Sequence, residues 1–116
     1  MSFFTEVTVV ENGQACAAQL ARFFSDAVPI RIPVNITALR GGAVRLREAA
    51  MLEFAAAEHV VFTSTLPLEF DDKVRIEGRR RDDLADATVV AVHYHNGEKA
   101  VAAKFLHGPC AWVARP

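Results

Sequence analysis

The stretch of this sequence richest in reactive side chains is VHYHNGE, residues 92–98. It carries His93, His95 and Glu98, and imidazole and carboxylate groups are common zinc ligands. Two histidines two residues apart share one face if the segment is a β-strand. A zinc site usually adds a fourth ligand or a protected pocket, with partners that orient the ligands, and none stands out here. We therefore expect no metal or cofactor and keep these three residues as weak candidates.

The Asn96-Gly97 pair indicates how these residues are arranged. Asn-Gly between alternating strands is the strongest short-range signal for a two-residue hairpin turn. Such a turn pairs His95 with Glu98 and Tyr94 with Lys99, which places the histidines and Glu98 on one face toward solvent. We expect the opposite, core face to hold Val90, Val92, Tyr94, Val101, Ala103 and Phe105, and the solvent face to hold His93, His95, Glu98, Ala100, Ala102 and Lys104.

No other group of residues indicates catalysis. Ser2, Ser25 and Ser64 lack the strand-turn-helix context of an activated nucleophile. The aspartate pairs at 71–72 and 82–83 fall in expected turns, where Asp is favoured for local hydrogen bonding. We expect a protein that is not an enzyme.

Basic residues suggest a place for an anionic ligand. Arg31, Arg40, Arg45 and Arg47 gather around one expected strand and its turn, and Arg22 lies upstream. Guanidinium groups bind phosphates in a forked geometry. The run Arg79 to Asp83 mixes both charges and is typical of a solvated loop.

Composition limits the class of protein. The chain has 116 residues, with 52% hydrophobic and 23% charged residues and a net charge of −1. This fits a soluble globular domain and argues against DNA or RNA binding, which needs a positive excess. No apolar run is long enough to span a bilayer, and no signal peptide is visible. Cys16 and Cys110 are far apart and fit two small buried hydrophobes. We expect a cytoplasmic protein.

Hydrophobic periodicity predicts the elements. The clearest strand is 28–38, VPIRIPVNITA, with strict alternation over its length. Pro29 and Pro33 cannot donate to a ladder, so we expect an edge strand or one whose first part is incompletely paired. We also expect a helix over 14–27, with Cys16, Leu20, Phe23 and Phe24 on one stripe. Further strands are expected at 3–10, 59–64, 73–77 and, as a hairpin, within 87–105.

Residues 43–58 are ambiguous. Arg45-Leu46-Arg47 alternates like a strand, whereas REAAMLEFAAAE has the composition of a helix, and tertiary context often overrides propensity. Short strands without a βαβ rhythm predict a mainly β fold, a small antiparallel β-barrel with one N-terminal α-helix. We expect one domain over 1–116, made of an extension (1–27), the barrel (28–106) and a tail (107–116) with Trp112 against the barrel end.

The order of these segments resembles the PilZ domain. The resemblance lies in PIRIPVNITA (29–38), AAAEHVVFTSTLPLEFDDKVRIEG (55–78) and ATVVAVHYHNGEKAVAAKFL (87–106). PilZ domains have a first strand that often continues "PV", a phrase like "LPLEPGDRVRLE", and a closing hairpin that ends in "VGVEF". The resemblance implies a small β-barrel that serves as a bacterial cyclic di-GMP receptor.

The binding motifs of the PilZ family are incomplete in this chain. The family uses an RxxxR segment for guanines and phosphates, and a D/NxSxxG segment for a polar side chain, a hydroxyl and close backbone approach. Arg31 stands at the second arginine position, and Ala27 stands at the first. The positions of Asp/Asn, Ser and Gly are taken by Phe54, Ala56 and His59.

Three functions remain open at this point. The first is a non-enzymatic signalling module that resembles PilZ domains, binds cyclic di-GMP weakly or not at all, and acts through a protein partner. The second is a structural barrel, either a homo-oligomer or a subunit of a larger complex. The third is a zinc-dependent module that uses His93 and His95.

Overall fold

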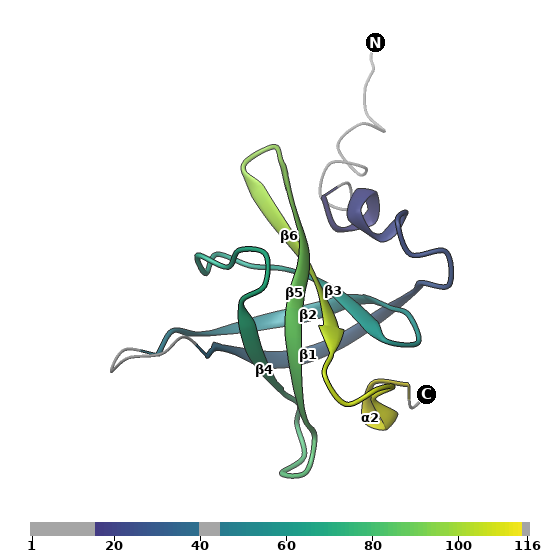
Figure 1. The fold of residues 1–116 in the computed structure, drawn as a ribbon, viewed down its shortest axis with the longest axis vertical. Helices are drawn as coiled ribbons and strands as arrows, with labels where there is room; N and C mark the ends of the chain where they lie inside the picture. Colours follow the sequence, from purple (N-terminus) through teal and green to yellow (C-terminus); the bar gives the residue numbers. More distant parts are fainter. Residues whose placement is uncertain (1–15, 40–44, 115–116) are drawn as a thin grey trace.

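The chain folds into a closed, six-stranded antiparallel barrel (Figure 1). The computed structural model describes residues 16–39 and 45–114, so the expected strand 3–10, the start of the expected helix and Arg40 lie outside them. The strand order around the barrel is β1-β2-β3-β6-β5-β4. The strands are β1 (Val28–Ala38), β2 (Arg47–Ala55), β3 (His59–Thr63), β4 (Lys73–Glu77), β5 (Leu84–His95) and β6 (Glu98–Phe105). Within the described ranges, no helix is long and apolar enough to cross a membrane.

Strand β1 has the predicted bounds, and its alternation builds the barrel interior. Val34, Ile36 and Ala38 are buried, whereas Val28 is 55% exposed. Strand β4 pairs with β1 only over Asn35–Ala38, so the half of β1 that carries the prolines pairs with β2 alone. This confirms the expected incomplete pairing, because a proline tolerates the side of a strand that needs no donor.

The ambiguous stretch forms a strand. Residues 47–55 are β2, which pairs with β1 along most of its length, from Arg47 opposite Thr37 to Ala55 opposite Val28. Leu52 is fully buried inside the barrel. Helix propensity differs among these residues by only tenths of a kcal/mol, and ladder pairing with burial outweighs it.

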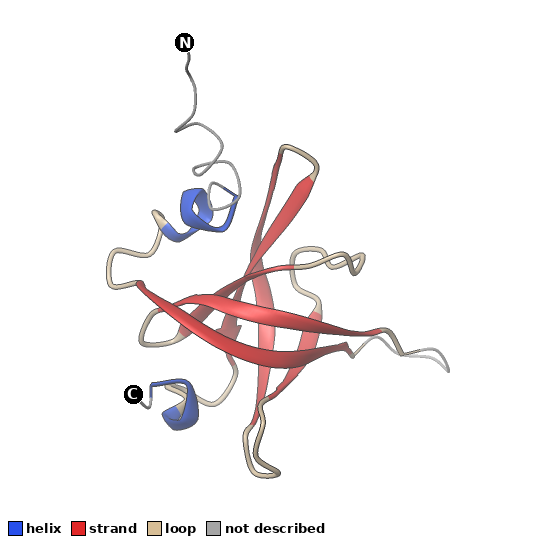
Figure 2. Cartoon of the chain, turned by 180° about the vertical axis from the view of Figure 1, so that it is seen from behind, coloured by secondary structure: helices blue, strands red, loops and turns tan. Residues whose placement is uncertain are grey.

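The hairpin of β5 and β6 has the predicted register, with His95 opposite Glu98 and Tyr94 opposite Lys99. Asn96 and Gly97 both have positive φ, 51° and 79°, as a type I′ turn requires. Several predictions about its faces are wrong, the first of them at Tyr94. Tyr94 is 70% exposed because the hairpin extends past the barrel, beyond the other strands (Figures 1 and 2).

The second error concerns Val90. The pairing register shifts between Val89 and Ala91, so one extra residue is inserted in β5. Such a bulge reverses the alternation on its two sides. Val89 is therefore fully buried in the barrel, and Val90 packs against the outer face of the sheet.

That outer face is covered, not solvated. The N-terminal helix, described over residues 16–21, lies beside the hairpin. We call the buried residues between them the outer cluster: Cys16, Ala17, Leu20, Ala21, Val61, Ala100 and Ala102. The predicted solvent positions of Ala100 and Ala102 are thus wrong, since both are fully buried.

The helix ends at Ala21, earlier than the predicted end at residue 27. Its last turn tightens, with Phe23 N–H donating to Leu20 O and Phe24 N–H to Ala21 O, and the chain then turns toward β1. Phe23 leaves the predicted apolar stripe and is 80% exposed, whereas Phe24 is half-buried. Hydrogen bonds over three residues are common where a helix ends.

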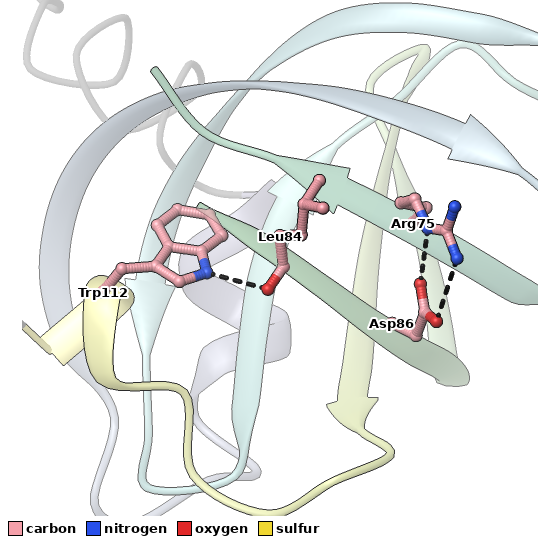
Figure 3. A network of polar contacts seen from close by, with 4 residues as sticks. All are labelled: Arg75, Leu84, Asp86 and Trp112. Carbon is pink, nitrogen blue, oxygen red and sulfur yellow. Dashed lines mark hydrogen bonds and ion pairs between the residues drawn. The ribbon is translucent and has the colours of Figure 1, made fainter. Parts of the chain in front are cut away.

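The tail lies against the barrel as expected. The short helix α2 (Ala111–Ala114) buries Val113, and Trp112 Nε1–H donates to the Leu84 carbonyl at 3.1 Å (Figure 3). On the neighbouring strands, Arg75 makes two hydrogen bonds to Asp86, at 2.9 and 3.3 Å. The Arg75 guanidinium lowers the pKa of Asp86. This pair joins β4 and β5 beside the Trp112 contact.

Candidate functional site

Among the described residues, the candidate arginines do not gather at one place. Arg31 is exposed on the half of β1 next to the N-terminal helix, and Arg22 is exposed just after that helix. Arg47 lies opposite Thr37 at the other end of β1 and forms an ion pair with Glu77 at 3.2 Å. Thr37 is six residues from Arg31 along the strand, which corresponds to roughly 20 Å. Arg45 is exposed two residues before Arg47, so both belong to the end of β2 that lies far from Arg31.

Residues 24–26, just before β1, are in contact with residues 57–59. The segment before β1 meets the turn between β2 and β3, because Ala57 N–H donates to Asp26 Oδ2 at 2.9 Å. The rings of Phe24 and His59 lie 4.6 Å apart between centroids, tilted by 39°. Phe54 packs against the outer cluster, as does Ala27. An aromatic and an imidazole ring therefore stand where these segments face each other.

His59 is half-buried at this contact. Burial lowers the pKa of its imidazole, and Lys104, opposite it on β6, lowers it further. Glu58 and Asp26 oppose this shift. The neutral ring favoured there can pack on Phe24 but offers no cationic group to a phosphate.

Arg31 opens onto a crevice between the helix and the barrel. The crevice has a volume of about 460 Å³ and is lined by Ala18, Pro29, Ile30, Arg31, Met51, Glu53 and Phe54. Burial raises the pKa of Glu53, and Glu98 adds to this, while Thr63 and Arg31 oppose it. A carboxylate beside the guanidinium reduces its attraction for an anion.

The histidines of the hairpin make contacts with other side chains of the protein. His93 Nε2 and Gln19 Oε1 of the N-terminal helix are 2.6 Å apart, so His93 is not simply solvated as expected. The rings of His93 and His95 stack with centroids 6.3 Å apart. Cys16 donates to the carbonyls of His93 and Glu98 from the same side. Within residues 16–39 and 45–114, no three His, Cys, Asp or Glu side chains form a group that could hold a metal ion.

A larger groove lies on the other side of the hairpin, and no sequence pattern predicted it. It has a volume of about 890 Å³ and runs between β2 and the hairpin. Its lining is Pro33, Glu48, Ala49, Ala50, Met51, Thr63, Ser64, Thr65, Tyr94, Gly97, Glu98 and Lys99. We call it the hairpin groove. Glu48 falls in the ambiguous stretch and Ser64 in an expected strand end, so no local signal marks them as neighbours.

Glu48 bridges the hairpin groove. Its carboxylate accepts from Ser64 Oγ at 2.6 Å, from Thr65 N–H at 2.8 Å and from the Thr65 hydroxyl. Burial raises the pKa of Glu48, but these hydrogen bonds and the Lys99 charge outweigh it, and the net pKa is lowered. Lys99 Nζ donates to the Leu66 and Leu68 carbonyls. Glu48 therefore stays ionised at neutral pH.

Comparison with known proteins adds no relative. No protein-family model matches the chain, and no curated protein is significantly similar to it in sequence.

Proposed function

We propose that this chain is a non-enzymatic bacterial signalling module that resembles PilZ domains, binds cyclic di-GMP weakly or not at all, and acts through a protein partner. The observation that carries the proposal is the contact between the segment before β1 and the turn after β2, made by Asp26 with Ala57 and Phe24 with His59. Phe24 and Asp26 directly precede the positions that match the RxxxR segment, Ala27 to Arg31, and Ala57 and His59 lie within the positions that match the D/NxSxxG segment, the two segments that hold the nucleotide in PilZ domains. A closed antiparallel barrel is compatible with the same resemblance.

The side chains at this contact argue against tight nucleotide binding. Arg31 supplies one guanidinium, and Ala27 supplies none where the family has its other arginine. Phe54 and Ala56 cannot replace a carboxylate and a hydroxyl as hydrogen-bond partners. Charged hydrogen bonds contribute about 1.5–3 kcal/mol each, so losing them costs several powers of ten in affinity.

Titration with cyclic di-GMP tests the nucleotide part of the proposal. We expect no thermal stabilisation of the full chain at about 100 µM ligand, because linkage makes the shift vanish when the dissociation constant lies well above that concentration. Calorimetry checks the same point. Submicromolar binding by the natural sequence would contradict the proposal.

Restoring the motif tests the resemblance itself. The variant Ala27→Arg/Ala56→Ser/His59→Gly replaces three of the missing groups and leaves Phe54 in its packing. We expect this variant to bind cyclic di-GMP at about 100 µM or tighter, because charged hydrogen bonds return. Adding Arg31→Ala should abolish that binding, whereas the exposed Arg45→Ala should not. A folded variant that gains no binding would exclude the PilZ-like role.

A structural role is a second candidate, favoured by exposed aromatic side chains. Phe23, Phe70 and Tyr94 are 80%, 72% and 70% exposed. Large exposed apolar side chains can mark interaction surfaces when they adjoin one another. Sedimentation velocity over a range of protein concentrations tests this role. A stable oligomer that Phe23→Ser or Tyr94→Ser dissociates would favour it over the signalling module.

A further inference from the structure

The hairpin groove exists because β2 and β3 separate. They pair at Leu52 opposite Phe62 and toward Ala55, but the first part of β2 has no pairing with β3. Beyond β3, Ser64 N–H donates to Lys99 O at 3.0 Å, so the chain follows β6 away from β2. The Glu48 side chain bridges the gap through its bonds to Ser64 and Thr65, and Thr63 Oγ1 at the end of β3 donates to Glu53 Oε2 of β2 at 3.2 Å.

The separation leaves main-chain groups of β2 without a partner strand. Ala38 N–H donates to Leu46 O at 2.8 Å, and the register between Ile32 and Thr37 is regular. Because hydrogen-bonded and non-hydrogen-bonded pairs alternate, Glu48 and Ala50 direct their main-chain groups to β1. Arg47 and Ala49 therefore direct their N–H and C=O groups away from β1. Among the described residues, no other main-chain group pairs with these two.

The walls beside this edge suit an extended peptide. Ala49, Ala50 and Met51 give a low apolar wall, and the Tyr94 ring stands exposed on the opposite wall. Glu48 and Glu98 contribute two carboxylates, whereas the one ammonium in the lining, Lys99, is held by the Leu66 and Leu68 carbonyls. The lining is negative overall, so it complements a basic side chain.

We propose that the hairpin groove binds an extended segment of a partner protein, which adds a strand to β2 at Arg47 and Ala49 and places a Lys or Arg side chain near Glu48 and Glu98. Strand addition draws affinity from main-chain hydrogen bonds and specificity from alternate side chains. The inference rests on the proposed role in protein recognition and assigns it a surface. Cyclic di-GMP would act on different residues, around Phe24, Ala57 and His59.

The test uses the full chain labelled with ¹⁵N and the peptide acetyl-Val-Lys-Val-Lys-Val-amide. We expect saturable shifts and slowed hydrogen exchange at the Arg47 and Ala49 amides, and weaker binding as salt is added. Two N-methylated isomers of the peptide are then compared, and the protein stays the same in both measurements. Each isomer is methylated on one of the two alternating sets of residues, so only one isomer loses the N–H groups that face β2. The isomer blocked on the bonding edge should bind about tenfold more weakly or worse, since it loses at least one main-chain bond and gains a clash.

Charge variants give a second readout. Glu98→Gln should weaken binding of the lysine peptide severalfold, whereas Glu69→Gln, an exposed control on the β3–β4 loop, should not. Circular dichroism checks that both variants fold. The proposal is overturned if Arg47 and Ala49 do not respond to the peptide, or if both N-methylated isomers bind equally. It is also overturned if both amides are protected in a concentration-dependent dimer without peptide, because a second copy then occupies the edge.

These outcomes are distinguishable from failure of the proposed function. A motif-restored variant that fails to bind cyclic di-GMP would remove the PilZ-like role without touching the response of Arg47 and Ala49. Conversely, if the hairpin groove does not bind the peptide, the outcome of the cyclic di-GMP titration, which concerns His59 and Ala57, is unchanged.

Discussion

Cys16 is a thiol sealed inside the outer cluster. It is fully buried, and burial raises the pKa of its thiol, with Glu98 and Glu53 adding to the rise. The thiolate is the reactive form of cysteine. Cys16 is therefore protected both because reagents cannot reach it and because its thiol ionises less readily. We expect Cys16 in the Cys110→Ser variant to react with a thiol reagent at least about a hundredfold more slowly than in urea, because a local opening must come first.

The matched variant is Cys16→Ser, which leaves the half-buried Cys110. In the native state, the Cys110 thiol of this variant should react faster than the Cys16 thiol of the Cys110→Ser variant. Equal rates for the two single-thiol proteins would show that the N-terminal helix does not stay on the hairpin.

His59 makes stability depend on pH. Burial and Lys104 lower the pKa of its imidazole in the folded state. As the pH falls below about 6.5, the unfolded chain takes up a proton before the folded one does, so stability is fully present above that pH and declines below it. The variant His59→Phe should therefore lose less stability than the natural protein between about pH 7 and pH 5.

Urea unfolding at several pH values measures this difference. The exposed His107→Gln is the control and should follow the natural protein. If His59→Phe has the same pH dependence as the natural protein, the desolvated packing of His59 on Phe24 is not its cause.

At the scale of elements, local alternation was sufficient where buried apolar residues alternate with polar ones. Strands β1 and β4 have the predicted bounds because Val34, Ile36, Val74 and Ile76 alternate with polar residues. Strand β2 could not be assigned, because its alanines carry no strong preference and its partners are distant in sequence. The bulge at Val90 has no local signal, and it changed which valine enters the barrel.

The candidate sites show the same limit. The contact of Phe24 with His59 was not predicted, since neither periodicity nor spacing places the segment before β1 beside the turn after β2. The hairpin groove was not predicted, since it depends on where β2 and β3 separate and on Glu48 reaching Ser64. The Asn96-Gly97 turn, in contrast, determined the pairing of His95 with Glu98 from two residues.

Gly78, directly after β4, has no room for a side chain. A Cβ there would lie 2.7 Å from Asp83 Cβ and 2.9 Å from Trp112 Cζ3. We expect Gly78→Ala to lower the free energy of unfolding by about 1–3 kcal/mol through overpacking. The chain has one tryptophan, so its fluorescence should report the displaced ring.

The neighbouring Arg79→Ala provides the control, because Arg79 is exposed in the loop after β4. Surface changes of this kind stay within about 0.5 kcal/mol. An unchanged tryptophan spectrum in Gly78→Ala would mean that α2 does not press on the end of β4.

At the scale of the whole molecule, two apolar cores lie on opposite sides of the same strands. The barrel interior holds Phe62, and the outer cluster holds Val61 on the other face of β3. The barrel closes through the pairing of all its strands, whereas the outer cluster depends on one helix. The outer cluster should therefore open without unfolding the barrel, because stability is not uniform across a structure.

Two core truncations separate the cores. Phe62→Ala should lower the global free energy of unfolding by about 3–5 kcal/mol, and Leu20→Ala should cost about 2–5 kcal/mol in the outer cluster. In Leu20→Ala we expect faster thiol reaction at Cys16 and faster hydrogen exchange at Ala100, while the Phe62 amide keeps its protection. Leu106→Ala, at a leucine that is 46% exposed, is the control and should change neither readout. If Leu20→Ala and Phe62→Ala weaken protection at Phe62 and Ala100 together, the two cores form one cooperative unit, and the helix is then part of the barrel's stability instead of a cover over the hairpin.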